Sequence, residues 1–208
     1  MSGVVSIKKA RQLAQKQASG RDELVEVAVE LFAQHGFAGT SIRDIADVMG
    51  RSVSNVYHYF ENKEALWFAI FEKSIKTLPG ELRDALDGVV GPRERVTALV
   101  RRHLEVTEHY RRESKIFFID EERLSPAGNR MNKRTQKEIL AIYMAEVEGL
   151  KLAGVMGGAD VKIAALNILG VINWYLRWSK PGMSAAKRTE TVDEVLQFIL
   201  RGLSGANT

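Results

Sequence analysis

One short stretch of the chain concentrates side chains that can hydrogen-bond to base edges and phosphates. It reads SVSNVYHYF over residues 52–60. Asparagine pairs with adenine edges, serine with several bases, and serine and tyrosine commonly bond phosphates. Val56 and Phe60 can face inward while the polar residues face out. The stretch therefore predicts a helix that reads nucleic acid, and its polar residues are Ser52, Ser54, Asn55, Tyr57 and His58.

A second short helix is predicted just before this one. Ser41-x-x-Asp44 has the layout of an N-terminal capping box, with Asp in place of the usual Glu or Gln. Met49-Gly50-Arg51-Ser52 joins the two helices, and glycine permits a tight turn at such a joint. The arrangement predicts a helix-turn-helix whose second helix enters the major groove. From these residues alone, an ordinary helical hairpin is the alternative.

Helical periodicity continues through the rest of the chain, and no period-two strand pattern is found. The first helix is expected from about Asp22 to Gly36. Ser52 is expected to cap the third helix and Asn62 the fourth. Longer helices are predicted at about 92–112, 114–123, 126–152, 159–179 and 186–203. The expected fold is all-α, with a basic arm (1–21), a three-helix helix-turn-helix head (22–71) and a larger helical body (72–208) for ligand binding and dimerisation.

Charge and composition limit the function classes. The net charge is +4 and no cysteine is present, which removes thiolate chemistry and disulfide frameworks. No nucleophile motif, phosphate loop or metal-ligand spacing is found, so we expect neither an enzyme nor a cofactor or metal site. No run approaches the roughly 18 apolar residues that span a bilayer, and no secretory signal is evident, so the prediction is a cytoplasmic protein with no membrane partner.

The first 21 residues carry five basic side chains and no acidic one. A basic segment before a nearly neutral body is typical of a tail that binds phosphates, and a solubilising or disordered N-terminus is the alternative. The predicted arm residues are Lys8, Lys9, Arg11, Lys16 and Arg21.

Residues 21–71 resemble the N-terminal domain of the TetR family of repressors. The matching residues keep the family's spacing throughout: Ala28, Leu31-Phe32, Gly36-Phe37, Thr40-Ser41, Asp44-Ile45-Ala46, Gly50, Ser52, Tyr57, Phe60, Lys63-Glu64 and Leu66. The resemblance implies a transcriptional repressor that binds double-stranded operator DNA. It places Ser52, Ser54, Asn55, Tyr57 and His58 on the recognition helix. It also implies phosphate contacts from Thr40, Ser41, Tyr57 and Lys63.

Two positions depart from the family pattern. The family usually has valine where this chain has Arg51, and often lysine where it has Val53. Arg51 is therefore expected either to supply a phosphate-binding cation from the turn, or to mark a helix that sits slightly differently. Base preference does not follow from the sequence.

The resemblance also implies a homodimer, in which two recognition helices read a palindrome. The family's interface lies on the last two long helices, and their broad apolar faces are compatible with this. Burial inside one subunit explains those faces equally well. The candidate interface residues are Val161, Ala165, Ile168, Ile172, Val192, Val195, Leu196 and Ile199.

The family's body binds a small-molecule effector. The stretch around Trp174, Arg177 and Trp178 resembles a subgroup whose effectors are acyl-CoA thioesters; arginine can bind phosphates and tryptophan can stack on a ring. Another hydrophobic ligand, a regulator without ligand, and a non-catalytic nucleic-acid or membrane-binding module stay open. The candidate ligand residues are Tyr110, Phe117, Phe118, Met131, Tyr143, Met144, Asn173, Trp174, Arg177 and Trp178.

Overall fold

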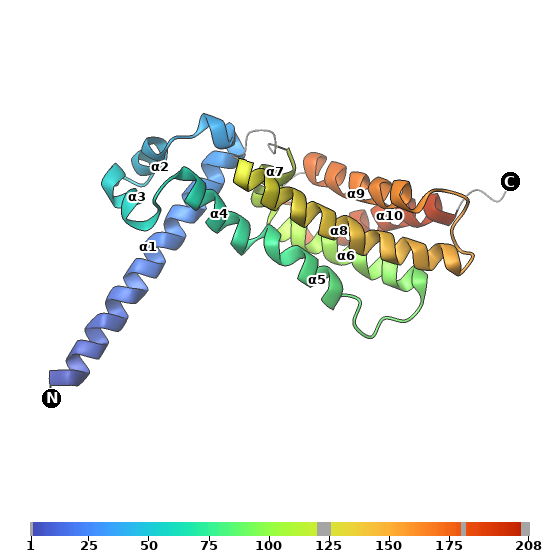
Figure 1. Ribbon diagram of the computed structural model, residues 1–208, viewed down its shortest axis with the longest axis horizontal. Helices are drawn as coiled ribbons and strands as arrows, with labels where there is room; N and C mark the ends of the chain where they lie inside the picture. The colour runs from blue at the N-terminus through green and yellow to red at the C-terminus, as the bar shows by residue number, and fades with distance from the viewer. Residues whose placement is uncertain (1, 120–125, 180–181, 205–208) are drawn as a thin grey trace.

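The computed structural model describes residues 2–119, 126–179 and 182–204, and within them the side chains of all but 2–17 and 118–119. These residues form ten α-helices and one 3₁₀ turn, with no strand among them (Figure 1). The helices are α1 (Ser2–Gly39), α2 (Ile42–Val48), α3 (Val53–Tyr59), α4 (Lys63–Lys73), α5 (Leu78–Asp84), α6 (Pro92–His109), α7 (Arg111–Ile119), α8 (Pro126–Leu152), α9 (Val161–Trp178) and α10 (Ala185–Ser204), and the 3₁₀ turn η1 is Ile75–Thr77. The predicted all-α fold with an N-terminal head is confirmed.

Side-chain caps fix where the three short helices of the head begin. Ser41 and Asp44 form the predicted capping box, in which the Ser41 amide donates to Asp44 Oδ2 at 2.7 Å and the Asp44 amide to Ser41 Oγ at 3.1 Å. Ser52 caps α3, and Asn62 caps α4. Each cap satisfies a backbone N–H that the first helical turn leaves without a partner. These starts are therefore encoded within four residues of sequence, and the predicted caps are confirmed.

The first helix differs from its prediction at the N-terminal end. It begins at Ser2 instead of near Asp22, so the segment predicted as an arm is part of a long helix that projects from the head (Figure 1). Lys, Arg, Ala and Gln are frequent in that segment and are strong helix formers. The prediction of an arm considered only the charge of the segment and not its helix propensity. The predicted break at Gly36 is present, because its φ of 75° is left-handed and interrupts the helical backbone.

Helix α5 was not predicted. Leu78-Pro79-Gly80 reads as a chain break, yet these residues form the first turn of α5. Proline costs little in a first turn, where its missing N–H would have no helical partner. The turn that follows α5 leads through Gly91, the N-cap residue, to Pro92 at the start of α6.

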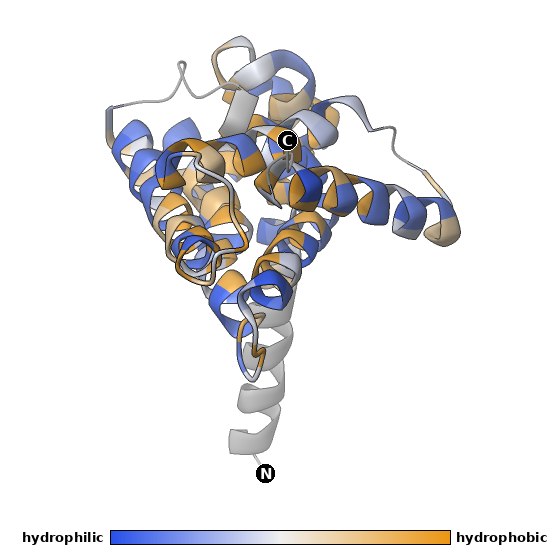
Figure 2. Ribbon diagram, turned by 90° about the vertical axis from the view of Figure 1, so that its right-hand side faces the viewer, coloured by the Kyte–Doolittle hydropathy of each residue, from blue (hydrophilic) through white to orange (hydrophobic). Residues whose placement is uncertain are grey.

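Two hydrophobic cores divide the molecule. The head core joins α1–α4 around Phe32, Ile45, Val56 and Trp67, and the body core joins α5, α6, α8, α9 and α10. Helix α7 follows α6 in the chain, but its buried residues Ile116 and Phe117 belong to the head core. Apolar and polar residues run along the body helices as separate stripes, which is the pattern of amphipathic packing (Figure 2). No helix in the described part of the chain is long and apolar enough to cross a membrane.

Candidate functional site

The turn between α2 and α3 depends on one glycine. Gly50 has a φ of 61°, a left-handed backbone conformation that is costly for residues with a Cβ. Its amide donates to the Asp47 carbonyl at 3.0 Å, and the next amide, from Arg51, donates to the Ala46 carbonyl at 2.9 Å. The turn brings α3 against α2, where Ile45, Ala46 and Val56 are buried together in the head core. Since Val56 faces inward, the polar residues of α3 on the opposite side face outward.

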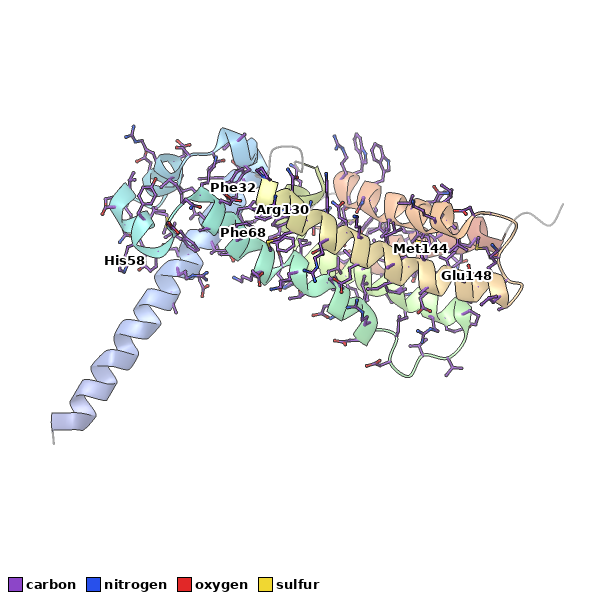
Figure 3. The ribbon with its side chains drawn as sticks, viewed as in Figure 1. Phe32, His58, Phe68, Arg130, Met144 and Glu148 are labelled. Carbon is purple, nitrogen blue, oxygen red and sulfur yellow. The ribbon has the colours of Figure 1, made fainter. Side chains whose placement is uncertain are left out.

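Helix α3 presents a polar surface at the end of the head that lies away from the body. Ser54 and His58 are exposed, and Tyr57 is 51% exposed. Figure 3 shows His58 at this outer end. Asn55 lies on α3, but its side chain is half-buried and its amide oxygen is covered. Ser52 is exposed, but its hydroxyl oxygen accepts the Asn55 amide at 3.2 Å as the helix cap.

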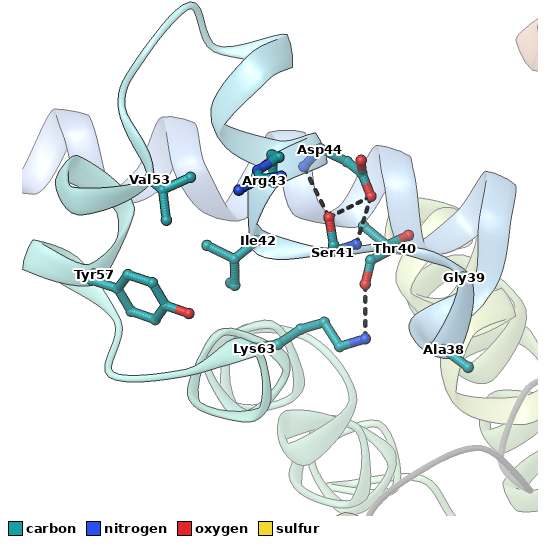
Figure 4. A pocket seen from close by; sticks show the side chains of 10 residues that line it. All are labelled: Ala38, Gly39, Thr40, Ser41, Ile42, Arg43, Asp44, Val53, Tyr57 and Lys63. Carbon is teal, nitrogen blue, oxygen red and sulfur yellow. Dashed lines mark hydrogen bonds between the residues drawn. The ribbon is translucent and has the colours of Figure 1, made fainter.

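A hollow of about 630 Å³ opens beside α3, between the start of α2 and the start of α4 (Figure 4). Tyr57 lines it from α3, Arg43 from α2 and Lys63 from α4. Tyrosine, arginine and lysine are all groups that bind phosphate oxygens, so this hollow has the chemistry of a backbone-contact site next to the recognition helix. Arg43 is exposed there and was not among the predicted contacts. Its place one residue after Ile42, in the first turn of α2, is the signal that could have found it.

Thr40 lies at the hollow, but its hydroxyl is turned to the protein backbone. Its side chain is buried, and its hydroxyl lies within hydrogen-bond distance of the Gly36 carbonyl at 3.0 Å and of the Leu31 carbonyl at 3.2 Å. A phosphate oxygen needs a donor, and the one hydroxyl proton of Thr40 is already engaged by backbone. The Ser41 hydroxyl likewise donates to Asp44 at 2.7 Å. Both side chains therefore have structural roles in the free chain, and their phosphate contacts stay predictions.

Lys63 holds the polypeptide where α1 ends. Its ammonium donates to the carbonyls of Phe37 at 2.6 Å and Thr40 at 2.7 Å, and lies 4.4 Å from the centroid of the Phe37 ring. Burial lowers the pKa of Lys63, and the nearby Asp44 opposes that shift. Two of its three ammonium protons serve these carbonyls. A direct phosphate contact by Lys63 would depend on the remaining one.

Arg51 pairs with an acid of α1 instead of pointing freely from the turn. The Arg51 guanidinium lies 2.5 Å from Glu23. At the same place α1 comes close to α3, since a Cβ added to Gly20 would lie 2.6 Å from the Tyr59 hydroxyl. The departure of this chain from the family's valine therefore creates an ion pair between α1 and the turn. The sequence predicted that Arg51 would either supply a phosphate-binding cation from the turn or mark a recognition helix that sits slightly differently.

Only one of the predicted arm residues has a described side chain. Arg21 lies 4.9 Å from the centroid of the Phe60 ring, directly after α3. The side chains of Lys8, Lys9, Arg11 and Lys16 lie outside the described residues.

The predicted ligand residues do not come together. Phe117 is buried in the head core with Met131 beside it, whereas Tyr143 is buried in the body core with Tyr110 and Met144 beside it. Asn173, Trp174, Arg177 and Trp178 are exposed on α9, and the side chain of Phe118 lies outside the described residues. The described residues of this set, from α7, α8, α9 and the C-cap of α6, therefore lie in different surroundings and do not line one site in this structure.

The predicted dimer residues also need correction. Six of them are buried inside the subunit: Ala165, Ile168, Ile172, Val192, Leu196 and Ile199. Val161 and Val195 are half-buried against the same core. A side chain that already fills its own subunit's core is not available to a partner. The large apolar residues that remain exposed on α9 and α10 are Ile163, Leu166, Trp174, Trp178 and Phe198.

Three of these exposed residues line an apolar groove between α9 and α10. The groove has a volume of about 700 Å³, and Leu166, Trp174 and Phe198 line it together with Gly170 and Gly202. Exposed apolar patches of this kind mark interaction surfaces in soluble proteins.

Two family models match the chain at the places where the geometry separates head from body. Residues 24–70 match the bacterial regulatory proteins of the tetR family, and residues 90–203 match the tetracyclin repressor-like C-terminal domain. The second match alone covers more than half of the 208 residues. The chain belongs to the TetR family.

Full-length relatives agree with membership of the TetR family. The HTH-type transcriptional repressor KstR2 of Mycolicibacterium smegmatis is 28% identical over 189 residues, which cover 90% of this chain and 92% of the relative. The structure of the ketosteroid transcriptional regulator KstR2 of Mycobacterium tuberculosis has a TM-score of 0.81 at 25% identity, covering 89% of this chain and 95% of that one. AibR in complex with isovaleryl coenzyme A and operator DNA has a TM-score of 0.74 at 20% identity, covering 89% and 98%, and this likeness shows the fold alone.

Membership of the TetR family settles the role of the head. The chain is a TetR-type transcriptional repressor, and α2, the Gly50 turn and α3 form its DNA-binding helix-turn-helix. The polar surface of α3 and the hollow beside it are the parts of this head that have the chemistry to contact DNA.

Proposed function

We propose that this TetR-family chain acts as a homodimer that binds a palindromic operator and is released from it by a small hydrophobic effector. The observation that carries the operator part is the outward polar face of α3. Ser54, Tyr57 and His58 are exposed on it, while Val56 fixes the opposite face in the head core. A helix held in this way can enter the major groove with its polar side chains toward base edges.

The hollow supplies the contacts that set the register of the helix on DNA. Arg43 and Tyr57 reach the phosphate backbone from its two sides, and Lys63 holds the backbone of the hollow in place. Phosphate contacts of this kind orient a protein on DNA and give most of the salt-dependent affinity. Arg21, next to Phe60, adds a cation on the side from which α1 enters.

A second copy of the chain covers the groove between α9 and α10. Leu166 is 43% exposed and Phe198 is 67% exposed in the isolated subunit, which is an unfavourable position for large apolar side chains. A twofold axis through this groove brings the same surface of both copies together, as an isologous interface requires. The two copies of α3 then read half-sites about one helical turn apart, roughly 34–36 Å.

The effector site lies at the C-terminal end of α9, beside that interface. The rings of Trp174 and Trp178 lie 5.5 Å apart, and Arg177 is exposed between them in sequence. An acyl-CoA thioester fits this chemistry, because arginine binds phosphates and indole rings stack on flat groups. KstR2 of Mycobacterium tuberculosis is a ketosteroid transcriptional regulator, which supports a bulky hydrophobic effector. A different hydrophobic ligand on the same aromatic surface is the second candidate.

Release requires that the effector bind the released conformation more tightly than the operator-bound one. A ligand with equal affinity for both would leave the DNA equilibrium unchanged. The proposal therefore places the change in the angle and spacing of the two heads.

The first test is fluorescence anisotropy of the full chain on a labelled duplex from the gene's own upstream region. We expect tight, palindrome-dependent binding that one CoA thioester reverses, whereas free CoA and the free acid do not. Ser54→Ala should weaken specific binding more than binding to a scrambled duplex, because it removes a hydroxyl from the face toward base edges. Tyr57→Phe should weaken binding to both duplexes, because Tyr57 contacts the phosphate backbone in this proposal. Weak binding without sequence preference would favour a general nucleic-acid module. Tight binding that no thioester disturbs would reject the ligand class and retain the repressor.

A further inference from the structure

Helix α7 is shared between the two halves of the molecule. It follows α6 in sequence, yet Ile116 and Phe117 are both fully buried in the head core. The Phe117 ring lies 4.8 Å from Trp67 and 5.3 Å from Phe71 of α4, measured between centroids. In Figure 1, α7 lies where the head meets the body. Its apolar side therefore moves with the head.

Arg111, the first residue of α7, contacts the body at the C-terminal end of α9. The Arg111 guanidinium donates to Ser179 Oγ at 2.9 Å and to the Leu176 carbonyl at 3.4 Å, and it also contacts the Ser179 carbonyl. Ser179 is the C-cap residue of α9. One planar guanidinium thus hydrogen-bonds to two carbonyls and one hydroxyl at the C-terminal end of α9. The helix dipole favours a cation at this end. Glu108 at 3.3 Å orients the same group.

This contact differs from the other charged links of α7. The Arg111 side chain is only 18% exposed, whereas the Arg112–Glu30 pair joins side chains that are 62% and 44% exposed. Exposed pairs are screened by water and contribute little, while a covered guanidinium with several acceptors holds its geometry. The link between α9 and α7 is therefore the stiffer of the two.

We propose that Arg111 is the positioning residue through which the C-terminal end of α9 sets the orientation of α7 and, with it, of the DNA-binding head. This inference rests on the proposed function, since it describes how a ligand at Trp174, Arg177 and Trp178 reaches the head. A ligand that displaces the end of α9 moves Ser179, and Arg111 carries that displacement into α7. Phe117 then transmits it to α4 through Trp67 and Phe71.

The test compares Arg111→Gln with Arg101→Gln in the full chain. Arg101 is a matched control, because its guanidinium also bridges two body helices, through Asp193 of α10 at 2.8 Å, without touching α7. Hydrogen exchange, read by mass spectrometry, measures the local stability of each helix in the absence of DNA. Anisotropy on the operator duplex is the second readout. Arg111→Lys keeps the charge but loses the forked geometry.

We expect Arg111→Gln to speed amide exchange in α7 and in the facing parts of α1 and α4 by about tenfold, with α10 unchanged. Operator affinity should fall about three- to tenfold, and Arg111→Lys should lie between the two. Arg101→Gln should leave both readouts at their original values.

Unchanged exchange in α7, or equal acceleration in every helix and in both variants, would overturn the proposal. So would faster exchange in α7 with operator affinity fully retained, because the link would then not orient the head. If the unmodified chain binds no duplex at all, the proposed function fails. The exchange result still decides in that case whether Arg111 joins α9 to α7.

Discussion

At the scale of single residues, Lys63 has a structural role, whereas the family resemblance implied only a phosphate contact. Its ammonium joins the carbonyls of Phe37 and Thr40, and so fixes the chain between α1 and α2. Arg43 lines the same hollow and is exposed. Lys63 therefore binds the protein backbone, whereas Arg43, in our proposal, binds the DNA backbone.

Replacing each cation separates these roles. Lys63→Met should lower the free energy of unfolding by about 1–2 kcal/mol, because two carbonyls lose a charged donor in a half-buried site. Arg43→Gln should leave stability unchanged and reduce the salt slope of operator binding by about one. Urea unfolding and anisotropy at several salt concentrations measure both. A reduced salt slope in Lys63→Met, with stability retained, would return Lys63 to a direct phosphate contact.

His103 is a second residue whose environment has a measurable consequence. Its ring is buried in the body core, with Nδ1 3.0 Å from the Tyr143 hydroxyl, and burial lowers its pKa from 6.5 to about 4. Between these two pKa values, His103 is therefore protonated in the unfolded chain and neutral in the folded chain. Stability is unaffected above about pH 7 and is lost as the pH falls toward 4.

We expect the unmodified chain to lose about 2 kcal/mol more stability than His103→Gln between pH 7 and pH 5, from a slope of about 1.4 kcal/mol per pH unit. Urea unfolding at a series of pH values gives both curves. Tyr143→Phe is the control, because it should lower stability at every pH and keep the acid dependence. Parallel curves for the unmodified chain and His103→Gln would mean that the imidazole is charged or hydrated in the folded body.

At the scale of the element, the turn between α2 and α3 has a conformational cause that can be isolated. A Cβ on Gly50 would touch nothing within 4 Å, so the left-handed φ of 61° is the whole cost of replacing it. Gly80 lies in α5, where a Cβ would also touch nothing within 4 Å, but its φ is not positive.

Gly50→Ala should therefore destabilise the head by about 1–2 kcal/mol, whereas Gly80→Ala should be neutral or stabilise by up to about 1 kcal/mol. Operator affinity should fall in Gly50→Ala because α3 shifts relative to α2. Thermal unfolding and anisotropy test the pair. If both substitutions changed stability equally, the backbone angle at position 50 would not be what limits the turn.

At the scale of the whole molecule, the groove between α9 and α10 has an apolar surface that one subunit leaves open. Phe198 is 67% exposed in it, while Leu152, at the end of α8, is 81% exposed and does not line it. Both side chains are large, apolar and mostly exposed, so the difference between them is that only Phe198 lines the groove.

Phe198→Asp should raise the dimer dissociation constant at least about 30-fold, since burying an unpaired carboxylate in an interface costs 2 kcal/mol or more. Leu152→Asp should leave it unchanged. Sedimentation equilibrium measures both, and circular dichroism checks that each variant is folded. A Phe198→Asp chain that stays dimeric would move the interface away from this groove.

Local sequence determined the parts of the molecule whose contacts span three or four residues. The caps at Ser41, Ser52 and Asn62, the break at Gly36 and the outward polar face of α3 all followed from such short-range patterns. Their hydrogen bonds close within one helical turn, so residue type and spacing suffice to predict them. The family of the head followed from the same residues.

Tertiary structure alone decided which partner each exposed or apolar group meets. The broad apolar faces of α9 and α10 are equally suited to an inner core or a partner, and packing against α6 and α8 made Ile168 and Leu196 core residues. Lys63 with Phe37, and Arg51 with Glu23, likewise pair across more than 20 residues of chain. Periodicity fixes a face but not its neighbour, because the neighbour depends on how distant helices pack together.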